Sequence, residues 1–114
     1  MIRVEKSGII ERPVEEVFAY IGDQTNAPAW QSGLVEVKRT TEGPIGVGTK
    51  HTLVRMFMRR RMEADNEYVA YEPDKLVTFK SISGPPLEAS YFFEPAGSGT
   101  RITSRVQLHV NAFS

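Results

Sequence analysis

The sequence predicts an α+β fold, in which a curved antiparallel sheet of about seven strands accompanies two short N-terminal helices. Helical signals are confined to residues 12–32, and the rest of the chain has the two-residue periodicity and turn residues of β-structure. The links between the later strands are short and rich in Gly and Pro. Such links permit antiparallel hairpins but are too short for parallel crossovers, so each strand is expected to pair with the next.

The first strand and the first helix are predicted before residue 23. Apolar and charged residues are interspersed over residues 2–10, which indicates a strand. Pro13 fits the first position of a helix, and Gly22 is expected to end it. Between them, apolar side chains recur at helical spacing: Val14, Val17, Phe18 and Ile21.

A second, shorter helical segment is expected within residues 23–32. Asn26 could cap it, and it carries Trp30, the only tryptophan. Six strands are expected after Gly33, around residues 35–38 and at 49–58, 61–71, 76–81, 87–94 and 100–110. The turn at residues 58–61 has no glycine, whereas a two-residue hairpin favours Gly or Asn, so a longer or looser turn is expected there.

Composition excludes several classes of function. We expect one domain over residues 1–114, with a single hydrophobic core. The 14 basic residues balance the 14 acidic ones, so neither nucleic acid nor an anionic membrane is expected as a partner. Charged residues interrupt the apolar ones between Met1 and Ile10, so no membrane insertion is expected there either. The chain has no cysteine, which excludes thiol chemistry, and its first ten residues have no signal-peptide core, so a cytoplasmic location is expected.

Five segments carry a resemblance to a known family. They are IIERPVEEVFAYIGD, APAWQSGLVEVK, GVGTKHTLV, YEPDKLVTFKSISGP and FFEPAGSGTRIT. In this order they resemble the START-like superfamily of polyketide cyclase/dehydratase-type (SRPBCC) proteins. The resemblance implies a helix-grip fold, with a curved sheet around a long C-terminal helix and an internal apolar cavity. Only four residues follow Val110, so that helix is expected to be absent and the apolar face of the sheet to lack its usual cover.

The resemblance also guides the choice of candidate ligand-binding residues. On the strand at residues 49–58, alternation places His51, Leu53, Arg55 and Phe57 on one face, and the resemblance favours this face as the cavity side. Apolar side chains with a few polar groups are typical of small-molecule sites. The predicted ligand-binding residues are Trp30, His51, Leu53, Arg55, Phe57, Asn66, Tyr68, Phe79, Tyr91, Phe93 and Ser104.

The polar members of this set have two interpretations. His51, Arg55 and Asn66 could meet a ligand, or they could be satisfied within the protein or by water, as most buried polar groups are. Trp30 could line a cavity mouth or could pack between helix and sheet. His51 is the candidate catalytic group, because imidazole titrates near neutral pH.

Other sites receive little support from the sequence. The segment at residues 43–50 has two glycines at phosphate-loop spacing, but Thr49 precedes Lys50, the reverse of the required order. The two histidines lack metal-ligand spacing, so no metal and no cofactor are expected. No Ser-His-acid combination is recognisable either.

Two hypotheses follow from the expected open face of the sheet. The first is a cavity that binds a small hydrophobic ligand, with or without polyketide cyclase/dehydratase-type activity. The second is a non-enzymatic interaction module, whose open face is covered by a second subunit or a partner helix, a homodimer being expected.

Overall fold

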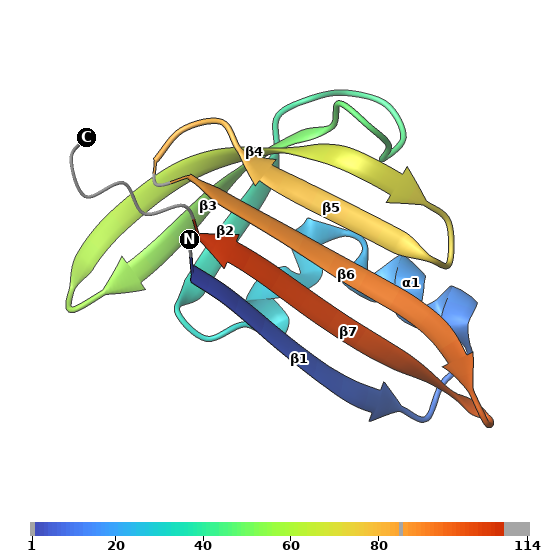
Figure 1. Ribbon diagram of the computed structural model, residues 1–114. Helices are drawn as coiled ribbons and strands as arrows, with labels where there is room; N and C mark the ends of the chain where they lie inside the picture. The colour runs from blue at the N-terminus through green and yellow to red at the C-terminus, as the bar shows by residue number, and fades with distance from the viewer. Residues whose placement is uncertain (1, 85, 109–114) are drawn as a thin grey trace.

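The computed structural model describes residues 2–84 and 86–108. Their helices and strands are, in chain order, β1 (Ile2–Ile10), α1 (Val14–Ile21), the 3-10 helix η1 (Gln24–Ala29), β2 (Leu34–Arg39), β3 (Lys50–Phe57), β4 (Arg60–Glu72), β5 (Leu76–Ser81), β6 (Leu87–Ala96) and β7 (Gly99–Leu108) (Figure 1). This order confirms the predicted α+β class. The predicted last two residues of the final strand, 109 and 110, lie outside the described residues.

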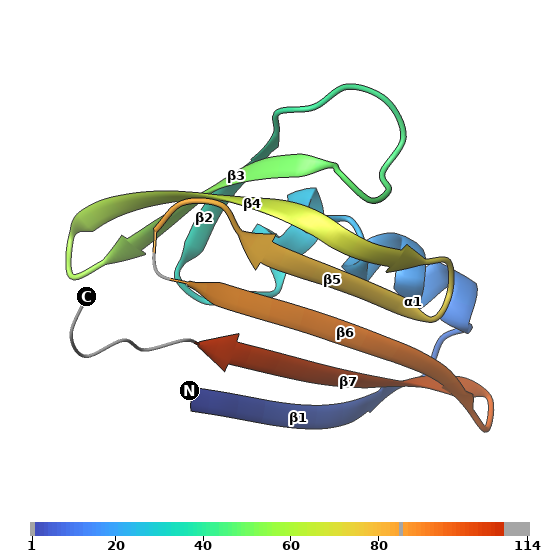
Figure 2. The same ribbon diagram turned by 45° about the horizontal axis from the view of Figure 1, so that its top comes forward.

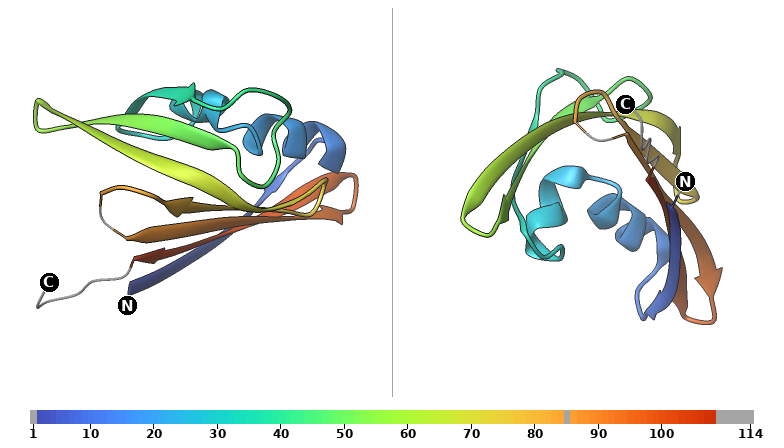
Figure 3. Two further views of the ribbon diagram at one scale, coloured as in Figure 1. Left: turned by 90° about the horizontal axis from the view of Figure 1, so that it is seen from above. Right: turned by 60° about the vertical axis from the view of Figure 1, so that its left-hand side comes forward.

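The seven strands form one antiparallel sheet in the order β1-β7-β6-β5-β4-β3-β2. From β2 to β7 the chain is a meander, and β1 joins the far edge by pairing with β7. The link from β1 to β2 must therefore cross from one edge of the sheet to the other. Helices α1 and η1 make this crossing on the concave side, and the sheet curves around them (Figures 2 and 3).

Helix α1 is amphipathic and buries one side against the sheet. Its Val17 and Phe18 are buried, and Gly22 ends it with an N–H that donates to the carbonyl of Phe18 at 2.8 Å. Pro13 lies one position earlier than predicted, at the extended residue that precedes the first turn. Glu15 and Glu16 lie in the first turn, where the helix dipole favours negative charge.

The expected cap of the second helical segment was wrong. Asp23 caps η1, because its carboxylate accepts from the backbone N–H of Thr25 at 3.0 Å. Asn26 instead donates its side-chain amide to the carbonyl of Tyr20 at 3.1 Å. Pro28 lies within η1, and Trp30 follows directly after its last residue.

The expectation of a loose turn between β3 and β4 was also wrong. Phe57 pairs with Arg60, so the turn has only two residues, Met58 and Arg59. Both have positive φ, at 51° and 65°. The ladder between the two strands is continuous from Lys50 to Phe57, and this pairing outweighs the cost of placing two non-glycine residues in the left-handed region.

The core lies between α1 and the middle strands of the sheet. Its buried apolar residues are Val17, Phe18, Tyr68, Val77, Phe79 and Phe93. A smaller cluster joins Ala27 of η1 to Leu34 and Leu53. Strand β7 is the last element of the described residues, and the predicted absence of a C-terminal helix concerns residues that lie outside them. None of the described helices is long and apolar enough to cross a membrane.

Candidate functional site

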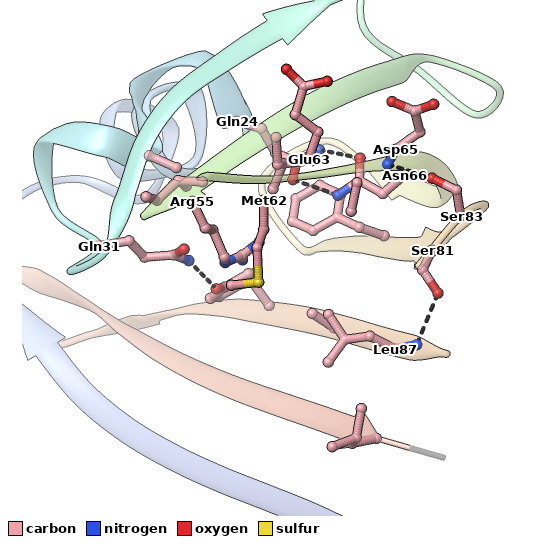
Figure 4. Close-up of a pocket in the computed structure, with 18 of the residues that line it drawn as sticks. Gln24, Gln31, Arg55, Met62, Glu63, Asp65, Asn66, Ser81, Ser83 and Leu87 are labelled. Carbon is pink, nitrogen blue, oxygen red and sulfur yellow. Dashed lines mark hydrogen bonds between the residues drawn. The ribbon is translucent and has the colours of Figure 1, made fainter. Parts of the chain in front are cut away.

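A cavity of about 380 Å³ lies on the concave side, between η1 and strands β3 to β6 (Figure 4). Its lining is mostly apolar and includes Ile21, Ala27, Trp30, Leu34, Leu53, Met62, Ala64, Phe79, Leu87, Ala89, Tyr91 and Leu108. The polar residues that line it are Gln24, Gln31, Arg55, Glu63, Asp65, Asn66, Ser81 and Ser83. This volume is in the range of small-molecule sites.

Alternation along β3 and β4 explains which side chains reach the cavity. Arg55 pairs with Met62 and Leu53 pairs with Ala64, so these four side chains share the concave face. The carboxylates of Glu63 and Asp65 lie on the opposite side of β4 from the Met62 side chain (Figure 4). Glu63 forms an ion pair with Arg61 at 2.9 Å, and Asp65 accepts from the hydroxyl of Thr52 at 2.6 Å.

The structure brings together about half of the predicted ligand-binding residues. Those that line the cavity are Trp30, Leu53, Arg55, Asn66, Phe79 and Tyr91. Ser104 lines a second cavity, described below. The structure places the other four away from both: His51, Tyr68 and Phe93 are buried, and Phe57 is exposed at the hairpin tip.

One polar group of the cavity is formed by Arg55, Gln31 and Tyr91. Gln31 donates its side-chain amide to the Tyr91 hydroxyl at 3.3 Å. Burial raises the pKa of Tyr91, while this hydrogen bond and the charge of Arg55 act in the opposite direction. Among the described residues Arg55 has no ion-pair partner, so its guanidinium can receive an acceptor or an anion from a ligand.

Trp30 stands beside this polar group. Its ring meets the ring of Tyr91 edge to face, with centroids 6.0 Å apart. Trp30 is 38% exposed and lines the cavity. It therefore packs between helix and sheet and lines the cavity at the same time, so the two interpretations of its role are compatible.

A second polar cluster lies where η1 meets β3 and β4. The side-chain amides of Gln24 and Asn66 donate to each other, at 3.0 and 2.9 Å. The Gln24 amide nitrogen also lies 3.4 Å from Nδ1 of His51. Because each amide satisfies the other, the cluster holds η1 against the sheet.

His51 lies behind Gln24 and is fully buried. Burial and the nearby charge of Arg39 lower the pKa of His51 to about 4, so the ring is neutral at pH 7. With Nδ1 accepting from Gln24, the ring proton resides on Nε2, which is buried without a hydrogen-bond partner among the described residues. Neither ring nitrogen is placed to exchange a proton with a molecule in the cavity.

Tyr68 is buried next to this cluster and has a structural role. Its hydroxyl donates to the carbonyl of Gly22 at 2.7 Å and accepts from the backbone N–H of Gln24 at 3.1 Å. Burial is the main cause of its raised pKa. Tyr68 therefore fixes the junction between α1 and η1, which carries the wall of the cavity.

A second cavity of about 310 Å³ lies over β1 and β7. It shares Ile21, Trp30 and Tyr91 with the first, so the two adjoin. Its other lining residues are Lys6, Ser7, Gly8, Ile10, Ile102 and Ser104. The apolar hollow therefore continues toward the β1 edge of the sheet.

The sequence analysis missed the cavity wall that comes from the helical side. Gln24, Ala27, Gln31 and Leu34 all line the cavity, from η1 and the residues around it. In the sequence, the only indication that these residues line the cavity was their closeness to Trp30. In the part of the chain that the structure describes, no group of three His, Asp or Glu side chains is placed to hold a metal ion.

Solved structures share this fold. A protein from Deinococcus radiodurans has 19% identity and a TM-score of 0.78, covering 96% of this chain and 83% of that one. Major latex-like protein 151 from Panax ginseng has 17% identity and a TM-score of 0.75, over 94% and 78%. The di-domain ARO/CYC StfQ from the steffimycin biosynthetic pathway has 12% identity and a TM-score of 0.79, over 96% and 37%. At these identities the likeness shows the fold alone.

Family membership rests on the sequence. Among curated proteins, none matches this chain. The family model described as "Polyketide cyclase / dehydrase and lipid transport" matches residues 1–114, the whole sequence. The chain therefore belongs to the polyketide cyclase/dehydrase and lipid transport family.

Proposed function

We propose that this chain binds a small hydrophobic molecule in the cavity beneath η1, with the polar end of the ligand against Arg55 and Tyr91. The observation that carries the proposal is an apolar cavity of about 380 Å³ that contains an arginine without an ion-pair partner among the described residues. Arg55 is half-buried, and a hydrogen bond from its charged guanidinium to a ligand acceptor is stronger than one between neutral groups. The Tyr91 hydroxyl can donate its own proton as well, because it accepts from Gln31.

Binding is favoured over catalysis. A cyclase or dehydratase reaction needs a group that accepts a proton at the reacting carbon. The carboxylates of Glu63 and Asp65 lie on the opposite side of β4 from the Met62 side chain (Figure 4). His51 is fully buried, with Nδ1 3.4 Å from the amide nitrogen of Gln24, and it does not line the cavity. Within the described residues the cavity therefore offers hydrogen-bond donors but no base.

A fluorescence titration with the uncharged probe N-phenyl-1-naphthylamine tests the proposal. We expect saturable binding and competition by decanol. At about 100 times the dissociation constant, a ligand adds about 2.7 kcal/mol to the free energy of unfolding. For a domain of this size, that corresponds to a rise in Tm of very roughly 10 °C.

A matched pair of variants identifies the site of binding. Ala89→Phe fills the cavity from β6 and is expected to abolish probe binding. Glu88→Phe adds the same ring to the other face of the same strand and is expected to leave binding unchanged. Absence of saturable binding by the wild-type protein contradicts the proposal, and so does equal binding by the two variants.

A second candidate function follows from the β1 edge. Ile2 and Val4 are 53% and 48% exposed, and they pair with Leu108 and Val106 of β7. We infer that a second copy of the chain covers this apolar part of the concave face. Sedimentation velocity at micromolar concentration should then give a dimer that Val106→Glu dissociates. A wild-type monomer contradicts this candidate and leaves the ligand proposal standing.

A further inference from the structure

The tip of the β3–β4 hairpin exposes apolar side chains next to arginines. Phe57 is 65% exposed and Met58 is 84% exposed. Arg59, Arg60 and Arg61 follow them directly in the sequence. Exposed apolar residues are ordinary when they are scattered, but two large ones at the end of a projecting hairpin form a surface that water solvates poorly.

The backbone of the turn makes these side chains unusual. Met58 and Arg59 both have positive φ, in a two-residue turn that Asn-Gly would form with less strain. The chain instead places two long side chains there. Residues held in such regions are found where the side chain serves a function, so the strain points to a role for the tip itself.

The tip of the hairpin carries positive charge even though the charges of the whole chain balance. Arg61 forms an ion pair with Glu63, whereas Arg59 and Arg60 have no ion pair within the described residues. The sequence analysis expected no membrane partner because the charges of the whole chain balance. At physiological salt, however, charges act over about 8 Å, so a surface that touches the tip responds to the two arginines and not to the total.

The tip also lies close to the cavity. Arg55 and Met62, which line the cavity, are only two residues away from Phe57 and Arg60, the pair that closes the turn. The hairpin projects beyond the rest of the sheet (Figures 1 and 3). A surface in contact with the tip would therefore lie near the cavity as well.

We propose that this tip docks on an anionic lipid bilayer. Phe57 and Met58 enter the interface between headgroups and acyl chains, and Arg59 and Arg60 contact lipid phosphates. A second copy of the chain fits less well, because two tips brought together would oppose like charges. A folded protein partner fits less well too, because a tip of four residues is far smaller than the roughly 800 Å² per partner of a stable interface.

Co-sedimentation with lipid vesicles tests the proposal. We expect the protein to bind vesicles of phosphatidylcholine and phosphatidylglycerol at 3:1 about tenfold more strongly than vesicles of phosphatidylcholine alone, with the difference reduced at 500 mM NaCl. Phe57→Ser should weaken binding to the anionic vesicles about tenfold, since it removes the larger apolar group.

The double variant Met58→Asn/Arg59→Gly separates docking from folding. It installs the residues that the turn favours, so Tm should stay the same or rise while vesicle binding falls about tenfold or more. Val47→Ser is the matched control, because Val47 is 70% exposed in the loop before β3, at the other end of that strand. It should leave vesicle binding unchanged.

Three outcomes overturn the proposal. They are no binding to anionic vesicles, equal binding by the wild type and the double variant, and a concentration-dependent dimer that the double variant abolishes. The test is independent of the ligand proposal, because probe titration in the absence of vesicles measures the cavity and co-sedimentation measures the tip.

Discussion

The concave face of the sheet has a covered half and an open half. Under α1, strands β4 to β6 contribute Tyr68, Val77, Phe79 and Phe93, of which none is more than 6% exposed. At the other edge every residue of β1 is exposed. Both halves carry apolar side chains in the same alternating pattern, so the difference between them comes from the cover and not from the strands.

The lengths of the elements explain the division. Helix α1 has eight residues and is therefore about 12 Å long. Seven strands at about 4.8 Å spacing make a sheet about 29 Å wide. The two short helices close the sheet over the middle strands, and the two cavities occupy the part of the concave face that they leave. Stability should depend on the covered half and ligand binding on the boundary between the halves.

The largest expected effect is a loss of stability when the core of the covered half is disrupted. Phe18 packs edge to face on Tyr71 and Phe93, with ring centroids 5.4 and 5.1 Å apart. Phe18→Ala removes this ring from a buried site and should lower the free energy of unfolding by about 3–5 kcal/mol. Val4→Ala in the open half should cost less than about 1 kcal/mol. Urea denaturation followed by Trp30 fluorescence measures both, and similar losses would refute the division into two halves.

A smaller effect depends on the buried His51. Its pKa is about 4 in the folded protein, compared with the ordinary histidine value of 6.5 that applies to the unfolded chain. Between these values the unfolded chain binds more protons, so stability falls as the pH falls through this window. We expect the free energy of unfolding to drop by about 2 kcal/mol from pH 7 to pH 4.5.

The variant His51→Gln provides the control, because an amide can still hydrogen-bond to Gln24 and does not titrate. Urea denaturation at several pH values should give it a nearly flat profile over the same range. Glu5, whose pKa is lowered mainly by its hydrogen bond with Arg105, is present in both proteins, so its contribution cancels when the two profiles are compared. Equal slopes for the wild type and the variant would assign the pH dependence to other groups.

The sequence predicted the strand side of the cavity better than the helical side. Alternation put Leu53 and Arg55 on one face of their strand, and the resemblance favoured that face as the concave side, where the structure has them. Gln24 and Gln31 were missed because the 3-10 helix that begins at Gln24 contains Pro28 and has no regular apolar period. Side chains in such a segment are positioned by tertiary contacts, which a single sequence does not display.

Two further differences between the sequence prediction and the structure have a similar cause. Alternation put His51 on the same face as Leu53, and the resemblance favoured that face as the cavity side. The sequence could not reveal that Gln24, which contacts His51, lines the cavity in its place. The turn at Met58 and Arg59 looked too tight for its residues. The continuous ladder of β3 and β4 set the turn length, so a long-range pairing prevailed over a local preference.

The smallest expected effect concerns Asp23, which caps η1 at the boundary between the covered and open halves. Asp23 caps η1 by accepting from the backbone N–H of Thr25 at 3.0 Å, and it lies 3.6 Å from Arg39. Asp23→Ala should cost about 1 kcal/mol of unfolding free energy. It should also weaken probe binding a few-fold, because η1 carries Ala27 and leads into Trp30, which line the cavity.

Asp23→Asn distinguishes the cap from the ion pair, since an amide oxygen can still cap the helix although the charge is lost. If the cap positions the cavity wall, Asp23→Asn should keep most of both the stability and the probe affinity. Equal losses in the two variants would assign the effect to Arg39 instead. Loss of stability without loss of affinity would mean that η1 is not a functional wall of the cavity, and that the boundary between the halves lies at Trp30.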